Sequence, residues 1–166
     1  MSGSPTLVLR FRDIERAEGQ TIKLHRDCIS QHGATWWGWL YRAYEQVPVE
    51  TLQGLKPEGA SAMDVCLYDT GQGRLYRARC TQIDCPDGFA ELSPEIQLTP
   101  SYYNGKEAPA WFRFVSIDDA SDDWILGRIC QSMPSATTEC SIDLVGSPVF
   151  KLSDLRRQEV TLWVIT

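Results

Sequence analysis

The alternation of apolar and polar residues predicts that the chain opens with a strand followed by a helix. Over residues 6–13 every second side chain is apolar, which is the pattern of a strand with one buried face. The spacing then changes to helical periodicity over residues 22–32. Thr21 is expected to cap the N-terminus of this helix and Gly33 to end it, because these residue types favour those positions.

A tryptophan-rich segment follows directly, and it places Trp36, Trp37 and Trp39 around Gly38. On a strand, Trp37 and Trp39 would share one face while Trp36 and Gly38 share the other. Glycine would leave a notch beside Trp36 where a flat ligand could approach the backbone. Because an indole needs both apolar contact and a partner for its N–H, each ring is expected either in the core or in the wall of a pocket.

The rest of the chain is predicted to consist of short strands and irregular segments. Two strands flank Gly71-Gln72-Gly73 and predict a hairpin, with Arg77 and Arg79 together on its outer face. One short helix is expected between Pro48 and Pro57. The later elements expected are a strand at 110–117, a short helix at 124–130, a brief strand at 149–152, a helix capped by Ser153 and a last strand at 160–165.

Length and charge narrow the range of functions. The 166 residues are 43% apolar and predict one domain over residues 1–166. We expect this domain to come from a longer chain, because the last strand reaches Thr166 without a tail. The net charge of −6 disfavours tight, non-specific binding of duplex nucleic acid, but a pocket for one base needs little net charge. With neither a signal peptide nor an apolar run of about 20 residues, the chain is expected in the cytoplasm and off the membrane.

Cysteines and histidines do not show the spacing of a metal centre. None of the six cysteines forms a Cys-x-x-Cys pair, so reduced and largely buried thiols are expected. Residues 118–123 contain four aspartates but lack the spacing and glycine of a calcium loop. We therefore expect no metal, no cofactor and no catalytic residue. His25 lies on an apolar helical stripe, where it is either a packing residue or a general base.

The order of the motifs resembles the PUA-like superfamily, in particular its EVE and ASCH branches. The resemblance covers about residues 6–117. It is carried by Trp36-Trp37-Gly38 after the first helix, Leu67-Tyr68-Asp69 at the end of a strand, and the strands at 76–83 and 110–114. In this sequence Trp39-Leu40-Tyr41 stands where EVE domains have Val-Arg-Asn. The chain also resembles, more loosely, sensor domains that precede effectors in bacterial defence proteins.

The resemblance implies an α+β fold, namely a PUA-like mixed β pseudobarrel with flanking short helices. It also implies an aromatic pocket for a modified nucleobase in DNA or RNA, or for a small nucleotide, and a C-terminal effector domain as partner. Aromatic rings would stack on the base while polar groups read its edge. The expected ligand-binding residues are Trp36, Trp37, Trp39, Tyr68, Asp69, Tyr102, Tyr103, Asn104 and Trp111.

Two other functions remain open at the level of the sequence. The aromatic residues could form a patch that docks a partner protein. The domain could also be an ASCH-like ribonuclease, for which His25, Arg10 and Lys23 are the candidate catalytic groups. No phosphate-binding loop or nucleophile motif accompanies them.

Overall fold

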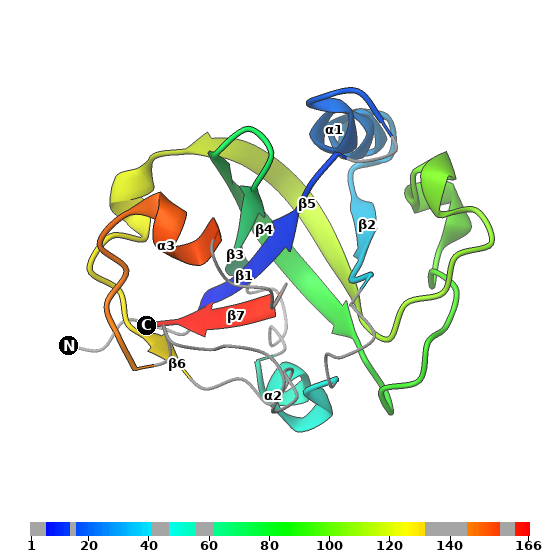
Figure 1. Ribbon diagram of the computed structural model, residues 1–166. Coiled ribbons are helices and arrows are strands. Elements are labelled where there is room, and N and C mark those ends of the chain that lie inside the picture. The colour runs from blue at the N-terminus through cyan, green and yellow to red at the C-terminus, as the bar shows by residue number, and fades with distance from the viewer. Residues whose placement is uncertain (1–5, 14–15, 41–46, 56–61, 132–145, 157–161) are drawn as a thin grey trace.

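The computed structural model describes residues 6–13, 16–40, 47–55, 62–131, 146–156 and 162–166. Within these residues one mixed sheet has the strand order β2-β5-β4-β3-β1-β7-β6 (Figure 1). β1 and β3 run parallel, and the other neighbouring pairs are antiparallel. The strands are β1 (Thr6–Phe11), β2 (Thr35–Gly38), β3 (Met63–Asp69), β4 (Arg74–Asp84), β5 (Trp111–Ala120), β6 (Cys130–Gln131) and β7 (Leu162–Ile165).

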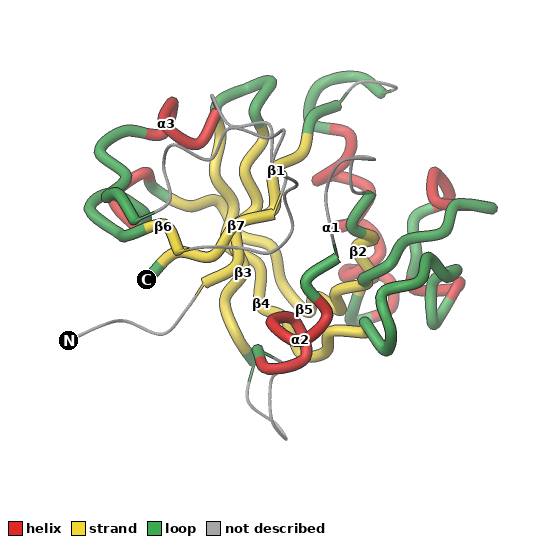
Figure 2. The backbone as a smooth tube through the Cα atoms, turned by 60° about the horizontal axis from the view of Figure 1, so that its bottom comes forward, coloured by secondary structure: helices red, strands yellow, loops and turns green. Residues whose placement is uncertain are grey.

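Short helices flank the sheet, so the predicted class, an α+β mixed β pseudobarrel, is confirmed. Helix α1 (Gln20–His32) packs against β2 and β5, whereas α2 (Val49–Gly54) lies at the opposite end of the strands (Figures 1 and 2). Helix α3 (Leu152–Arg156) packs Leu155 into a cluster with residues of β1, β3 and β6. None of the helices in the described residues is long and apolar enough to cross a membrane.

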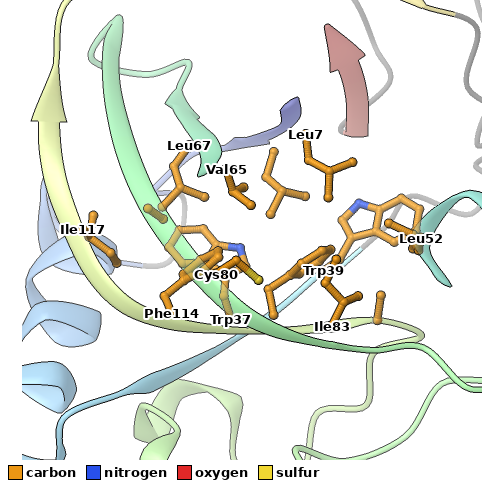
Figure 3. Close-up of a cluster of buried hydrophobic side chains, with 14 of the residues drawn as sticks. Leu7, Trp37, Trp39, Leu52, Val65, Leu67, Cys80, Ile83, Phe114 and Ile117 are labelled. Atoms are coloured by element: carbon orange, nitrogen blue, oxygen red, sulfur yellow. The ribbon is translucent and has the colours of Figure 1, made fainter. Parts of the chain in front are cut away.

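The main core fills the concave side of the sheet. Figure 3 shows Trp37 and Trp39 pointing toward Leu7, Leu52 and other apolar side chains of this interior. Alternation along each strand sends the neighbouring residues to the convex side. Two further clusters cover that side, and between them lies the outer surface of β4 and β5.

We name these two clusters after the segments that cover them. The α3 cluster is made of Val8, Cys66, Tyr68, Leu75, Ile125, Cys130, Val149, Leu155 and Ile165. The loop cluster lies under the segment 91–110 and is made of Ala34, Trp36, Leu98, Tyr103, Ala108 and Trp111.

The hairpin of β3 and β4 forms where Gly71-Gln72-Gly73 predicted it, but β4 departs from simple alternation. Tyr76, Ala78 and Cys80 face the core, which leaves Arg77 and Arg79 on the outer face as predicted. The pairing with β5 then shifts in register around Cys80, and Ile83 rather than Gln82 becomes buried. A bulge of this kind bends a strand and re-aims the side chains that follow it.

Helix α1 ends at Gly33 as predicted, but Thr21 does not cap its start. Gly19 occupies the N-cap position with a φ of 81°, and the carboxylate of Asp13 caps the helix from outside. Oδ2 of Asp13 accepts from the Gly19 N–H at 2.9 Å, while Oδ1 accepts from the N–H and hydroxyl of Thr21 at 3.1 and 2.5 Å. A negative charge there also complements the helix dipole.

Three predictions for the C-terminal half are wrong. The turn of helix expected at 124–130 lies earlier, at Asp122–Trp124, and residues 149–152 do not form a strand. Ser153 lies inside α3 rather than before it. The carboxylate of Asp154 instead accepts hydrogen bonds from the N–H groups of Phe150 and Lys151, so the acidic residue organises this turn.

Replacing Asp13 by alanine is expected to lower the free energy of unfolding by about 1–3 kcal/mol, because three hydrogen-bond donors at the start of α1 lose their acceptor. Urea unfolding measures the change. Asp27→Ala is the matched control: its carboxylate makes an exposed ion pair with Lys23 one turn away, worth only about 0.3–0.5 kcal/mol. Equal losses in the two variants would contradict the capping role.

Candidate functional site

All four tryptophans expected to line a pocket are buried, and none exposes more than 4% of its surface. Trp37 and Trp39 belong to the main core, where the ring of Trp37 stacks on that of His25 with centroids 4.5 Å apart. Trp36 and Trp111 lie on the other side of the sheet, in the loop cluster. The alternation predicted for the tryptophan segment is therefore correct.

The notch beside Trp36 is filled by the protein itself rather than left for a ligand. A Cβ atom at Gly38 would lie 2.7 Å from the ring of Trp111. The Tyr103 hydroxyl donates to the Gly38 carbonyl and accepts from its N–H, both at 3.1 Å. The indole N–H of Trp111 donates to the carbonyl of Glu91 at 2.9 Å. These contacts fasten the segment 91–110 onto β2.

A hollow of about 330 Å³ opens within this fastened segment. Tyr103 and Asn104, both expected at the site, line it together with Glu95. The remaining lining residues are Leu92, Ser93, Pro94, Ile96, Gln97, Thr99 and Gly105. Ligand pockets typically range from about 300 to 1,000 Å³, so this hollow suits a ligand of the size of one base rather than a large cofactor.

Glu95 connects the hollow to the loop cluster behind it. Its Oε1 accepts a hydrogen bond from the indole N–H of Trp36 at 3.1 Å, and Nε of Arg113 lies 3.9 Å from the same oxygen. Its backbone carbonyl accepts from the Thr99 hydroxyl at 2.7 Å, and that hydroxyl also hydrogen-bonds to Ser93. Glu95 is thus a positioned acceptor at the wall of the hollow.

Tyr102 does not line the hollow but packs against Tyr103, with ring centroids 4.2 Å apart. Its hydroxyl lies 2.7 Å from Nε2 of His25, and the guanidinium of Arg16 lies 3.9 Å from the centre of its ring. Nδ1 of His25 hydrogen-bonds to the Thr35 hydroxyl at 2.9 Å. Burial, aided by the charge of Arg16, lowers the pKa of His25 to about 3. Both ring nitrogens are engaged and the ring is neutral, which favours the packing role.

The last two expected residues, Tyr68 and Asp69, are not among those that line the hollow. Tyr68 is buried in the α3 cluster. Asp69 lies at the end of β3, where its Oδ1 accepts from the N–H groups of Gly71 and Gln72 and shapes the hairpin turn. Burial raises the pKa of Asp69 above its usual value.

Sequence reasoning missed Glu95, the most clearly positioned polar group of the hollow. Its segment was expected to be irregular, and Pro94 and Pro100 mark turns on either side of it. Nothing in the local pattern separates this glutamate from other acidic residues on loops. Its role depends on Trp36, which lies 59 residues earlier in the chain.

The thiols of the described residues are free and mostly buried. Burial raises the pKa of Cys80 to about 12 and that of Cys130 to about 11. A thiol with so high a pKa carries almost no thiolate at neutral pH and is a poor nucleophile. No group of three or more metal-ligating side chains occurs within the described part of the chain.

A model of the Pua-like family matches residues 7–166. The chain belongs to the Pua-like family. At the level of that family, membership indicates a module that binds nucleic acid or its bases. Comparisons with curated proteins and with solved structures found no similar protein.

Replacing Gly38 by alanine is expected to lower the free energy of unfolding of this Pua-like domain by about 1–3 kcal/mol, because the new methyl group overlaps the ring of Trp111. Gly54→Ala is the control, since nothing lies within 4 Å of a Cβ atom at that position in α2. Alanine there should leave the stability unchanged or raise it by up to about 1 kcal/mol. Urea unfolding of both variants tests the contact, and a neutral Gly38→Ala would refute it.

The stability of the domain is expected to fall as the pH drops below about 6.5. In the unfolded chain His25 takes up a proton near pH 6.5, but in the folded protein its pKa is about 3. Between these values His25 alone should cost about 1.4 kcal/mol of stability per pH unit. Urea unfolding from pH 7 to 5 should show a shallower slope for His25→Gln than for the parent. His32→Gln, at the exposed end of α1, should keep the parent slope.

Proposed function

We propose that this domain is a sensor that recognises one nucleobase, modified or part of a small nucleotide, in the hollow of the segment 91–110. The observation that carries the proposal is the hollow of about 330 Å³ in which Tyr103, Glu95 and Asn104 meet. Family membership supports the class of ligand. The site differs from the expected tryptophan cage, because Trp36 and Trp111 pack behind its wall while Trp37 and Trp39 lie in the main core.

The lining residues suit a base that presents N–H groups. An ionised carboxylate accepts hydrogen bonds only, so Glu95 would favour an edge with amino or imino donors. The amide of Asn104 can both donate and accept, and it is exposed at the rim. Tyr103 offers an aromatic wall, although the ring itself is largely buried. Apolar contact with this wall and a few edge hydrogen bonds are the usual means of holding an extruded base.

The sensor part of the proposal concerns an effector domain or partner protein that responds to the occupied hollow. We expect the segment 91–110 to transmit the occupation of the hollow to the rest of the domain. It is tied to β2 through Tyr103 and Gly38 and to α1 through Tyr102 and His25. A ligand that moves Glu95 would also reach Trp36 through their shared hydrogen bond.

A protein-docking role is the second candidate, because large apolar side chains are exposed in the segment 91–110 and just before it. Phe89 is 73% exposed, Leu92 58% and Ile96 72%. Leu92 and Ile96 also line the hollow. These three side chains lie within eight residues of one another in the sequence, and contiguous exposed apolar side chains are typical of interaction surfaces. A Phe89→Ser variant separates the two roles, since Phe89 is not a lining residue and its loss should leave nucleoside binding unchanged.

The proposed function is tested by titrating the protein with a panel of natural and modified nucleosides while the tryptophan fluorescence is recorded. A nucleoside that enters the hollow should change the emission of Trp36 through its hydrogen bond to Glu95. Glu95→Gln keeps the shape but removes the charge, and it should weaken binding by about tenfold or more, since hydrogen bonds to charged groups contribute about 1.5–3 kcal/mol.

Glu50→Gln is the matched control, because Glu50 is exposed on α2 and is not a lining residue. It should bind as the parent does. Binding that is equal in all three proteins would place the base outside the hollow. The absence of binding across the whole panel would contradict the proposal.

A further inference from the structure

The outer surface of β4 and β5 carries a row of arginines that the hollow does not use. Arg113 of β5 and Arg79 and Arg77 of β4 lie on the convex side of the sheet, between the loop cluster and the α3 cluster. Their side chains are 31%, 42% and 50% exposed, in that order. Part of each arginine side chain therefore remains exposed to solvent, in a chain whose net charge is −6.

The row begins at the hollow. Nε of Arg113 lies 3.9 Å from the Glu95 carboxylate that lines it. The same guanidinium donates to the hydroxyl of Thr81 on β4 at 3.1 Å. Thr81 is two residues from Arg79 on that strand, so polar side chains lead from the hollow onto β4. Val115 of β5 packs against the loop cluster on the same side of the sheet.

Asp64 of β3 holds the two arginines of β4 side by side. Arg79 donates to Asp64 at 2.6 Å and to the carbonyl of Ala62 at 3.0 Å, and Arg77 donates to the other oxygen of Asp64. Burial alone would raise the pKa of Asp64, but the hydrogen bonds from both guanidiniums lower it below its usual value. A guanidinium has five N–H donors, so these bonds orient the two groups and leave donors for an incoming phosphate.

The row ends at an aromatic ring. The guanidinium carbon of Arg77 lies 5.2 Å from the ring centre of Trp124, which is half-buried. Asp118 is paired with Arg77 across β4 and β5 and reduces the local positive charge. The three arginines thus form a line of oriented hydrogen-bond donors between the hollow and the ring of Trp124, rather than a broad basic patch.

We propose that a single strand of nucleic acid lies along this arginine row, with its phosphates on the guanidiniums and one base in the hollow. Guanidiniums bind phosphates well, and grooves for single strands combine such charges with aromatic surfaces for bases. The inference rests on the proposed function and deepens it: the ligand is an unpaired strand rather than a free nucleoside. From Gln82, which pairs with Arg113, to Arg77 the row spans about 16 Å at 3.3 Å per residue, or about four to five stacked nucleotides.

The test compares a nucleoside, chosen for its binding to the hollow, with oligomers of two, four and six nucleotides that contain it. Dissociation constants are measured at several salt concentrations. We expect the affinity to rise up to about four nucleotides and the salt dependence to steepen with length. Arg79→Gln should weaken binding of the four-nucleotide strand by about fivefold or more and reduce the salt slope by about one, while leaving nucleoside binding unchanged.

Arg74→Gln is the matched control, because Arg74 is exposed on the same strand but alternates to the other side of the sheet. It should bind strands as the parent does. Arg77→Gln provides a second variant at a more exposed position should Arg79→Gln fail to fold. Arg79→Lys keeps the charge and should keep most of the salt slope.

The outcomes separate the two proposals. Binding of the nucleoside with no gain in affinity for longer strands would overturn the arginine row and leave the proposed function intact. Strand binding that depends on Arg77 and Arg79 but not on Glu95 would support the row and place the base elsewhere. Equal losses from Arg74→Gln and Arg79→Gln would reduce the effect to overall charge and overturn the row. Binding of a fully paired duplex as tightly as the single strand would contradict it as well.

Discussion

The contact of the Trp111 ring with the backbone of Gly38 is the constraint on which the rest of the site depends. A side chain at position 38 would occupy the space of this ring. Apart from one bridge between Glu91 and Ala108, the segment 91–110 contains only short 3-10 turns. Its position therefore depends on the surface on which it lies. Two aromatic anchors, Trp111 against Gly38 and the Tyr103 hydroxyl on both backbone groups of Gly38, supply that position. The hollow is therefore formed by an irregular loop whose inner side is well packed against the sheet.

The same constraint explains why the tryptophans were easier to place on strands than to assign to a function. Alternation correctly predicted that Trp36 and Trp37 face opposite sides of β2. It does not indicate what covers each side, because that depends on segments distant in sequence. Trp36 is covered by a segment about 60 residues later, and the glycine notch receives a ring 73 residues away. The order of the motifs and the family resemblance therefore predicted the fold. Two of the expected site residues, Tyr103 and Asn104, line the hollow, whereas Glu95 was not predicted.

The two ends of α1 also differ in whether neighbouring or more distant residues determine them. Gly33 ends α1 through its own backbone conformation, and it was predicted from local sequence. The start of α1 is capped by Asp13, at the end of the preceding strand, so the local preference of Thr21 for the N-cap position did not decide the outcome. A charged acceptor that reaches both Gly19 and Thr21 satisfies more donors than one hydroxyl can. The bulge in β4 likewise lies where its register with β5 shifts, around Cys80.

In the proposed mode of binding, specificity and affinity come from different contacts. Edge contacts to one base can discriminate between bases, but a single base in a small hollow provides limited binding free energy. Contacts to phosphates add affinity without reading the sequence. The net charge of −6 opposes the approach of long polyanions to the chain as a whole, so these contacts with phosphates act locally. An arginine row directly beside the hollow would therefore favour strands whose recognised base is already inside the hollow. The sequence-independent contacts to phosphates then strengthen the binding of strands that the base contacts have selected.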